Sequence, residues 1–158
     1  MSQLLERHVV RCPYHLARLY LADSIGPSAR SGAATRLGLT VSGPGIELTK
    51  SVVATFAPTT DPMHFDQPWR IHWDPQSGPY PQFDGELTVR ADETYESALL
   101  ELRGSYRPPG GALGAAFDWA AGSRIATATA RELLARLGSE IESRYQRDEE
   151  AKRRSTAS

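Results

Sequence analysis

The segment Leu99–Trp119, "LLELRGSYRPPGGALGAAFDW", decides the fold that the sequence predicts. It begins with the alternation of a β-strand, which places these residues on one side: Ala98, Leu100, Leu102, Gly104 and Tyr106. The two prolines that follow lack N–H donors and stop the pairing of this strand. The next two glycines allow backbone angles that other residues resist. We therefore expect a sharp local turn that leads from the last strand into a long helix.

The residues from Ser123 onward have the pattern of that helix. Apolar side chains recur at helical spacing and form one stripe: Ala126, Ala130, Leu133, Leu134, Leu137 and Ile141. Most charged residues lie off the stripe, so the helix has one apolar face that needs a partner. After about Tyr145 no apolar side chain is larger than alanine. We therefore predict that residues 148–158 form a disordered polar tail.

The residues before this segment predict a first strand, a helix and an antiparallel meander. The first strand spans Leu4–Cys12, and the helix begins at Pro13 and ends at Gly26, with a loop through residue 34. Five further strand candidates are separated by short turns, at residues 35–43, 46–58, 69–75, 82–92 and 94–106. Such a sheet buries one face in the core and exposes the other face to solvent. The predicted class is α+β: a curved antiparallel sheet of six or seven strands wrapped around the C-terminal helix.

Length and composition predict one domain over residues 1–147. The chain has 158 residues, of which 40% are hydrophobic and 23% charged, which is ordinary for a soluble globular protein. The formal net charge of −1 argues against nucleic acid or an anionic membrane as the main partner. No window approaches the ~20 apolar residues of a membrane span, and no apolar signal core follows Met1. We therefore expect a cytoplasmic protein.

Three stretches of the sequence carry a resemblance to a known family. They are "WDPQSGPYPQFDGELTV" (Trp73–Val89), "LELRGSYRPPGGALGAAFD" (Leu100–Asp118) and "RIATATARELLARL" (Arg124–Leu137). Together with the order of elements, they resemble the helix-grip fold, and in particular bacterial members of the START-like (SRPBCC) superfamily. That superfamily includes polyketide cyclase/dehydrase and lipid-transport proteins. Its members usually have two short helices after the first strand, whereas only one is clear here.

The resemblance implies an interior cavity between the curved sheet and the C-terminal helix. Its lining would come from the inward face of the sheet and the turn into the helix: Lys50, Trp69, Ile71, Trp73, Phe83, Leu102, Tyr106 and Phe117. As plain core, the cluster of Trp69, Ile71 and Trp73 needs no further explanation, and this is the favoured interpretation; as a cavity wall, the indole N–H groups would orient a ligand oxygen. Lys50 interrupts an apolar face. Either strand twist carries its ammonium to the rim, or the ammonium binds a ligand carboxylate or phenolate.

No motif for metal, nucleotide or nucleophilic chemistry stands out. His64 with Asp66, and His72 with Asp74, do not have the spacing of a metal motif. The glycine-rich stretches lack the pattern of a phosphate loop, and no GxSxG elbow is present. The single cysteine, Cys12, has no internal disulfide partner and is interpreted as a core residue. We therefore predict neither a metal nor a cofactor.

The leading functional hypothesis is binding of a small hydrophobic molecule: a lipid, an isoprenoid or a polyketide-like aromatic. The first alternative is a cyclase or aromatase without metal or nucleotide cofactor, which needs at least two ionisable groups pointing inward. The predicted inward faces offer Lys50 and Tyr106. The second alternative is an interaction module with a filled core. The sequence leaves open whether the protein is an enzyme and whether it forms a homodimer.

Overall fold

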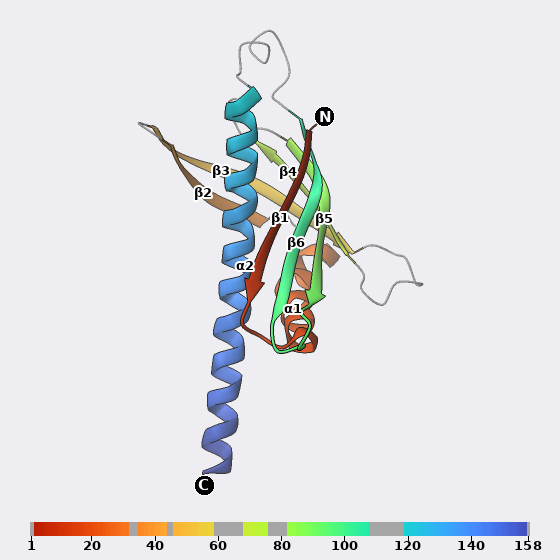
Figure 1. Ribbon diagram of the computed structural model, residues 1–158, viewed down its shortest axis with the longest axis vertical. Coiled ribbons are helices and arrows are strands. Elements are labelled where there is room, and N and C mark those ends of the chain that lie inside the picture. Colours follow the sequence, from red (N-terminus) through yellow and green to blue (C-terminus); the bar gives the residue numbers. More distant parts are fainter. Residues whose placement is uncertain are drawn as a thin grey trace.

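The computed structural model describes residues 2–31, 35–43, 46–58, 68–75, 82–107 and 119–157. Side chains are described for 2–27, 54–57, 68–74, 82–107 and 123–157. The elements, shown in Figure 1, are β1 (Ser2–Val10), α1 (Tyr14–Ser31), β2 (Thr35–Gly43), β3 (Ile46–Pro58), β4 (Trp69–Pro75), β5 (Gln82–Ala91), β6 (Ala98–Arg107) and α2 (Trp119–Thr156).

The strands form one antiparallel sheet in the order β1-β6-β5-β4-β3-β2. Strands β2 to β6 follow one another as a meander, and β1 is added beside β6, which places the first and last strands of the chain side by side. The seventh strand that the sequence left open is not seen in the described ranges. The long helix α2 contacts β1 most extensively and also touches β2, at the opposite edge (Figure 1). The sheet is therefore curved enough for one helix to reach both of its edges.

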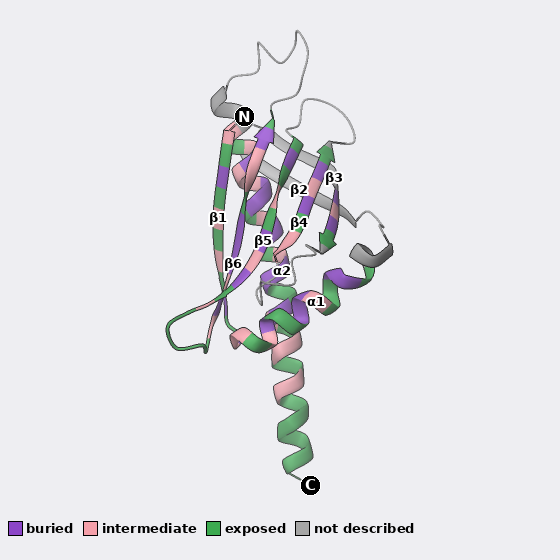
Figure 2. Ribbon diagram, turned by 90° about the vertical axis from the view of Figure 1, so that its right-hand side faces the viewer, coloured by how far each residue is buried: buried purple, intermediate pink, exposed green. Residues whose placement is uncertain are grey.

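Where side chains are described, in β1, β4, β5 and β6, the strands largely alternate between a buried inner face and an outer face (Figure 2). Side chains of β4 to β6 that are buried on the inner face include Ile71, Trp73, Phe83, Leu87, Val89, Leu100, Leu102 and Tyr106. Successive side chains of a strand point to opposite sides, so period-2 patterning separates an apolar from a polar surface. The assignment of inward residues in β4, β5 and β6 from the sequence is confirmed.

Two helices cover the inner face. The stripe predicted on α2 is confirmed, because all of its members are at most 7% exposed: Ala126, Ala130, Leu133, Leu134, Leu137 and Ile141. Helix α1 adds a second cover through Ala17, Leu21 and Ile25, and it contacts β3 and β5 as well as α2. The core is therefore a three-sided contact of sheet, α1 and α2.

The predicted end of the first helix at Gly26 was wrong, because α1 includes Pro27 and continues to Ser31. Proline removes one backbone donor and normally ends or kinks a helix. Here Ile25 and Gly26 are still buried against the rest of the protein. Tertiary packing beside this position outweighs the local preference for a helix end.

The prediction of disorder over residues 148–158 was also wrong for most of that segment, since α2 continues to Thr156. Figure 1 shows this end of α2 extending beyond the sheet. The segment contains no glycine or proline, and Lys152 donates to Glu149 one turn earlier, at 3.1 Å. Good helix formers and pairs of this spacing favour continuation of a helix that packing has already nucleated.

A pair of glycines allows one aromatic ring to lie flat on the inner face. Gly85 and Gly104 are directly opposite one another in β5 and β6. A Cβ added at Gly104 would come within 2.6 Å of Cζ of Phe83. The missing side chains therefore leave the space that the Phe83 ring occupies.

The turn that motivated the fold prediction, at residues 108–111, lies outside the described residues. The structure describes the elements on either side of it: β6, which ends at Arg107, and α2, which begins at Trp119 and packs against the sheet.

Candidate functional site

The structure brings six of the predicted lining residues together on the inner face of β4, β5 and β6. Five are buried: Ile71, Trp73, Phe83, Leu102 and Tyr106. Trp69 is partly buried and packs against the same core. The ring of Trp73 stacks on Phe83, with 4.1 Å between centroids and 18° between planes. This stacked pair is the centre of the candidate site, and Tyr106, opposite Phe83 in the register, is buried on the same face.

The other two predicted lining residues cannot be placed. The backbone of Lys50 pairs with Leu39 in the β2–β3 ladder, but its side chain lies outside the described residues. Phe117 lies entirely outside them. The sequence-based roles of both residues stay predictions.

Small side chains occupy one stretch of the buried face of α2, ahead of Leu133, Leu134 and Leu137. Ala126, Thr129 and Ala130 are at most 1% exposed. The Thr129 hydroxyl donates to the carbonyl oxygen of Ile125 at 2.8 Å, so its hydrogen-bonding capacity is directed into the helix itself. This part of α2 therefore presents to the core an almost wholly apolar surface made of small side chains.

Cys12 is a core residue, as the sequence suggested. It is fully buried, and its Sγ contacts the carbonyl oxygen of Pro13 at 3.6 Å. Burial, followed by the negative charge of Glu142, raises the pKa of the Cys12 thiol to about 11. The thiol is therefore protonated at neutral pH and is a poor nucleophile.

Polar contacts hold α1 to the distal half of α2. The Tyr20 hydroxyl donates to Asp148 at 2.7 Å, and this hydrogen bond, with burial, raises the pKa of Tyr20 to about 12. Arg144 pairs with Asp23 at 2.9 Å and lies over the Tyr20 ring. Ser24 donates to Glu140 at 3.0 Å. These contacts fix the angle between the helices.

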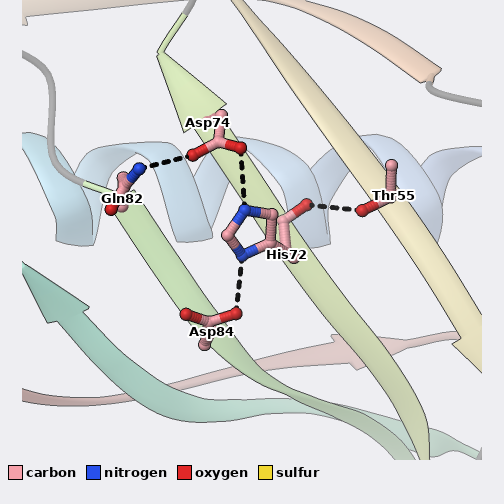
Figure 3. Close-up of polar contacts among 5 residues, drawn as sticks. All are labelled: Thr55, His72, Asp74, Gln82 and Asp84. Carbon is pink, nitrogen blue, oxygen red and sulfur yellow. Dashed lines mark hydrogen bonds and ion pairs between the residues drawn. The ribbon is translucent and has the colours of Figure 1, made fainter.

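A second cluster, on the outer face of the sheet, has the geometry of a histidine between two carboxylates (Figure 3). His72 Nδ1 lies 2.6 Å from Asp84 and Nε2 lies 2.9 Å from Asp74. Gln82 donates to the other oxygen of Asp74 at 2.7 Å, and Thr55 donates to the His72 carbonyl oxygen at 3.4 Å. Both ring nitrogens donate only when the imidazole is protonated, so the arrangement favours the imidazolium.

The charge state of His72 follows from these contacts. Burial acts to lower the pKa of His72, but the hydrogen bonds to Asp74 and Asp84 and their negative charges outweigh it and raise that pKa. A shallow hollow of about 430 Å³ adjoins the ring, between Thr55, Arg70 and Glu86. Because each ring nitrogen already has a carboxylate partner, the cluster ties β4 to β5 and leaves no nitrogen free to act as a base.

Sequence reasoning noticed His72 and Asp74 but missed the cluster. The two residues share a face of β4 because they are two positions apart, which the alternation does predict. Asp84 joins them only through the β4–β5 register, which pairs it with His72. The cluster could have been predicted if the register had been known, because the register places a histidine opposite an aspartate on the outer faces of neighbouring strands.

Comparisons with known proteins give a structural likeness. The chain matches no protein-family model, and no curated protein is significantly similar to it. Among solved structures, the protein TTHA0849 from Thermus thermophilus superposes with a TM-score of 0.48 at 14% identity, covering 89% of this chain and 97% of that one. These comparisons leave the family of this chain unassigned.

Two further properties hold within the described ranges. None of the helices there is both long and apolar enough to span a membrane. No group of three or more His, Cys, Asp or Glu side chains there is arranged to hold a metal ion.

Proposed function

We propose that this chain is a helix-grip protein of the START-like type that binds a small hydrophobic molecule between the inner face of its sheet and α2. The observation that carries the proposal is the presence of two distinct surfaces within one core. One is the aromatic cluster of Trp73, Phe83 and Tyr106, and the other is the small-residue face of α2. Both belong to one continuous hydrophobic core.

The chemistry of these surfaces suits an apolar ligand with a flat or ring-like part. Stacked aromatic rings favour offset contact with a further ring, and each buried aromatic side chain contributes a large apolar area. Small residues on the helix reduce the side-chain volume there, which is what a ligand cavity would require. The few polar groups on this surface, such as the Tyr106 hydroxyl, would orient the ligand rather than react with it.

The arrangement of elements supports the same proposal. Because α2 contacts both edge strands, an apolar ligand beside α2 would be shielded from water by sheet and helix together. Trp69 and Ile125 are only partly buried and pack against the core. They mark places where the apolar interior comes near the surface, as an entrance requires.

Native mass spectrometry of the freshly purified chain tests this function. We expect a fraction of the protein to carry a non-covalent small-molecule adduct that is lost under denaturing conditions. A chain that stays bare, both as purified and after incubation with a medium-chain fatty acid and with a polycyclic aromatic probe, would contradict the proposal and favour the interaction module.

A matched pair of variants on α2 locates the binding place. Ala130→Leu enlarges the side chain at a buried position, whereas Ala135→Leu makes the same change at an exposed position of the same helix. We expect Ala130→Leu to weaken adduct formation at least tenfold and Ala135→Leu to leave it unchanged. Circular dichroism of both variants establishes that each remains folded, and equal adduct levels in the two would contradict the placement.

A further inference from the structure

A buried carboxylate lies on the outer face of the sheet, where the other described side chains are exposed or partly exposed. Glu101, in β6, is 3% exposed although it points away from the hydrophobic core. Three guanidiniums from three strands surround it: Arg7 Nε at 2.9 Å, Arg90 Nη2 at 3.2 Å and Arg103 Nη2 at 3.5 Å. We call these four residues the Glu101 hub.

The hub carries more positive charge than its carboxylate can offset. Three guanidiniums and one carboxylate leave a net charge of +2. The outer face continues with Glu86, which is opposite Arg103 in one neighbouring strand and opposite Arg70 in the other. Including Glu86 and Arg70 adds one negative and one positive charge, so the excess of two positive charges remains.

Glu101 keeps its charge and thereby positions the arginines. Burial acts to raise the pKa of Glu101, but the hydrogen bond from Arg7 and the positive charges of Arg90, Arg7 and Arg103 outweigh it and lower that pKa. The carboxylate is therefore ionised throughout the neutral range. It holds the three guanidiniums close together against their mutual repulsion.

The arginine side chains of the hub remain open to solvent. Arg7, Arg90 and Arg103 are 55%, 56% and 62% exposed. Each guanidinium has five N–H donors, and the acceptor positions of one carboxylate can use only a few of the donors available in the hub. The rest face water around a small area of the sheet.

We propose that the Glu101 hub binds a doubly charged oxyanion, namely a phosphate group. Such a group carries about −1.5 to −2 charges at neutral pH and presents three acceptor oxygens, which matches both the excess charge and the unused donors of the hub. Guanidinium groups bind phosphate through paired, charge-assisted hydrogen bonds. The hub lies on the face opposite the proposed apolar site, so the two sites are independent.

The same chemistry has two sources. One is a free phosphate or a small phosphorylated molecule. The other is the phosphate headgroup of a lipid, for which the exposed Leu5 and Val9 on either side of Arg7 would add apolar contact. The experiment therefore has an arm for each source.

In the first arm, the isotope-labelled full chain is titrated with sodium phosphate and, at matched ionic strength, with sodium chloride, and amide shifts are followed by NMR. We expect saturable shifts with phosphate, but not with chloride, at the backbone of β1, β5 and β6 around the hub. The Arg90→Ala variant should bind phosphate at least tenfold more weakly. Arg124→Ala, which removes an exposed arginine of α2, is the matched control and should bind as the unmodified chain does.

In the second arm, sedimentation measures binding to phosphatidylcholine vesicles with and without phosphatidic acid. Binding that depends on phosphatidic acid and is lost in Arg90→Ala assigns the lipid source, whereas phosphate shifts without vesicle binding assign the soluble one. If Arg90→Ala fails to fold, Arg90→Lys, which keeps the charge but not the paired donors, serves in both arms with a smaller expected loss. Equal responses to phosphate and chloride, together with vesicle binding that Arg90 substitutions do not change, would overturn the proposal.

Discussion

The inner and outer faces of this sheet are stabilised by different forces. On the inner face, fully buried residues such as Trp73, Phe83 and Leu102 are held by removal of apolar surface from water and by close packing. On the outer face, two ionised centres, His72 and Glu101, join neighbouring strands by hydrogen bonds to opposite charges. Apolar packing contains no titratable group, so pH does not act on it directly, whereas the ionised centres respond to both pH and charge screening by salt.

The contributions of the two ionised centres to stability also depend on pH in opposite directions. His72 has a raised pKa, so its contribution is present at low pH and is lost as the pH rises. Glu101 has a lowered pKa, so its contribution is present at high pH and is lost as the pH falls. The outer face is therefore expected to be fully stabilised only in a window between the two transitions. Four substitutions test this contrast, from the largest expected effect to the smallest.

Leu102→Arg tests the inner face. Leu102 is fully buried, so an arginine there brings an unpaired charge into the core, and we expect a loss of more than about 4 kcal/mol in the free energy of unfolding, or no folded protein. Leu19→Arg is the control, because Leu19 is 53% exposed on α1, away from the core. Urea denaturation measures both, and a stable Leu102→Arg variant would show that the faces are assigned the wrong way round.

Glu101→Gln tests the outer face at its buried carboxylate. Hydrogen bonds to charged groups contribute about 1.5–3 kcal/mol, and we expect a loss of that size at neutral pH. Because the folded-state pKa of Glu101 is below the ordinary 4.5, the difference from the unmodified chain should shrink as the pH falls through that lowered value. Thermal unfolding over a series of acidic pH values measures it. A difference that does not depend on pH would show that packing, not charge, is responsible.

Gly104→Ala tests the close approach of the Phe83 ring to the sheet. The added methyl would meet both that ring and the backbone of Gly85, and overpacking of this kind costs about 1–3 kcal/mol. Ser105→Ala, at the next position and on the outer face, should change stability by less than about 0.5 kcal/mol. Chemical denaturation of the two variants is the measurement, and equal stabilities would contradict the packing described for Phe83.

His72→Gln should have the smallest effect. The side chain of His72 is 40% exposed, so solvent screens its two carboxylate contacts, and we expect a loss of at most about 1 kcal/mol in mildly acidic solution. The full destabilisation by His72→Gln is expected below the ordinary pKa of 6.5. It should become smaller as the pH rises through the raised pKa of His72 in the folded protein. NMR titration of the imidazole and thermal unfolding at several pH values measure it. A variant that is least affected in acid would reverse the assigned sign.

How far sequence reasoning reached depends on the range of the interactions concerned. Alternation within a strand predicted the inward positions of Trp73, Phe83 and Leu102. Helical periodicity likewise predicted the buried stripe of α2. These patterns repeat within a few residues, so they are readable without knowing which segments meet.

The predictions that failed involved competition between local preference and distant packing. Pro27 would end an isolated helix, but buried residues beside it keep α1 helical. The polar end of α2 lacks an apolar stripe, yet Asp148 receives a hydrogen bond from Tyr20 of α1, which supports the helix there. Neither outcome follows from the residues of the segment alone.

The sequence by itself determined the α+β class, the bounds of β2, β3 and β4, and the apolar surfaces of sheet and helix, because the physics of each is local. Only the tertiary structure decided the angle between α1 and α2, the histidine between two aspartates and the carboxylate among three arginines. Each of those depends on strand register or helix contact, which brings together residues as far apart in sequence as Arg7 and Glu101. The pattern of a single strand carries no information about such partners. A charged residue on an outer face gives the same sequence pattern whether or not an oppositely charged residue lies on the next strand.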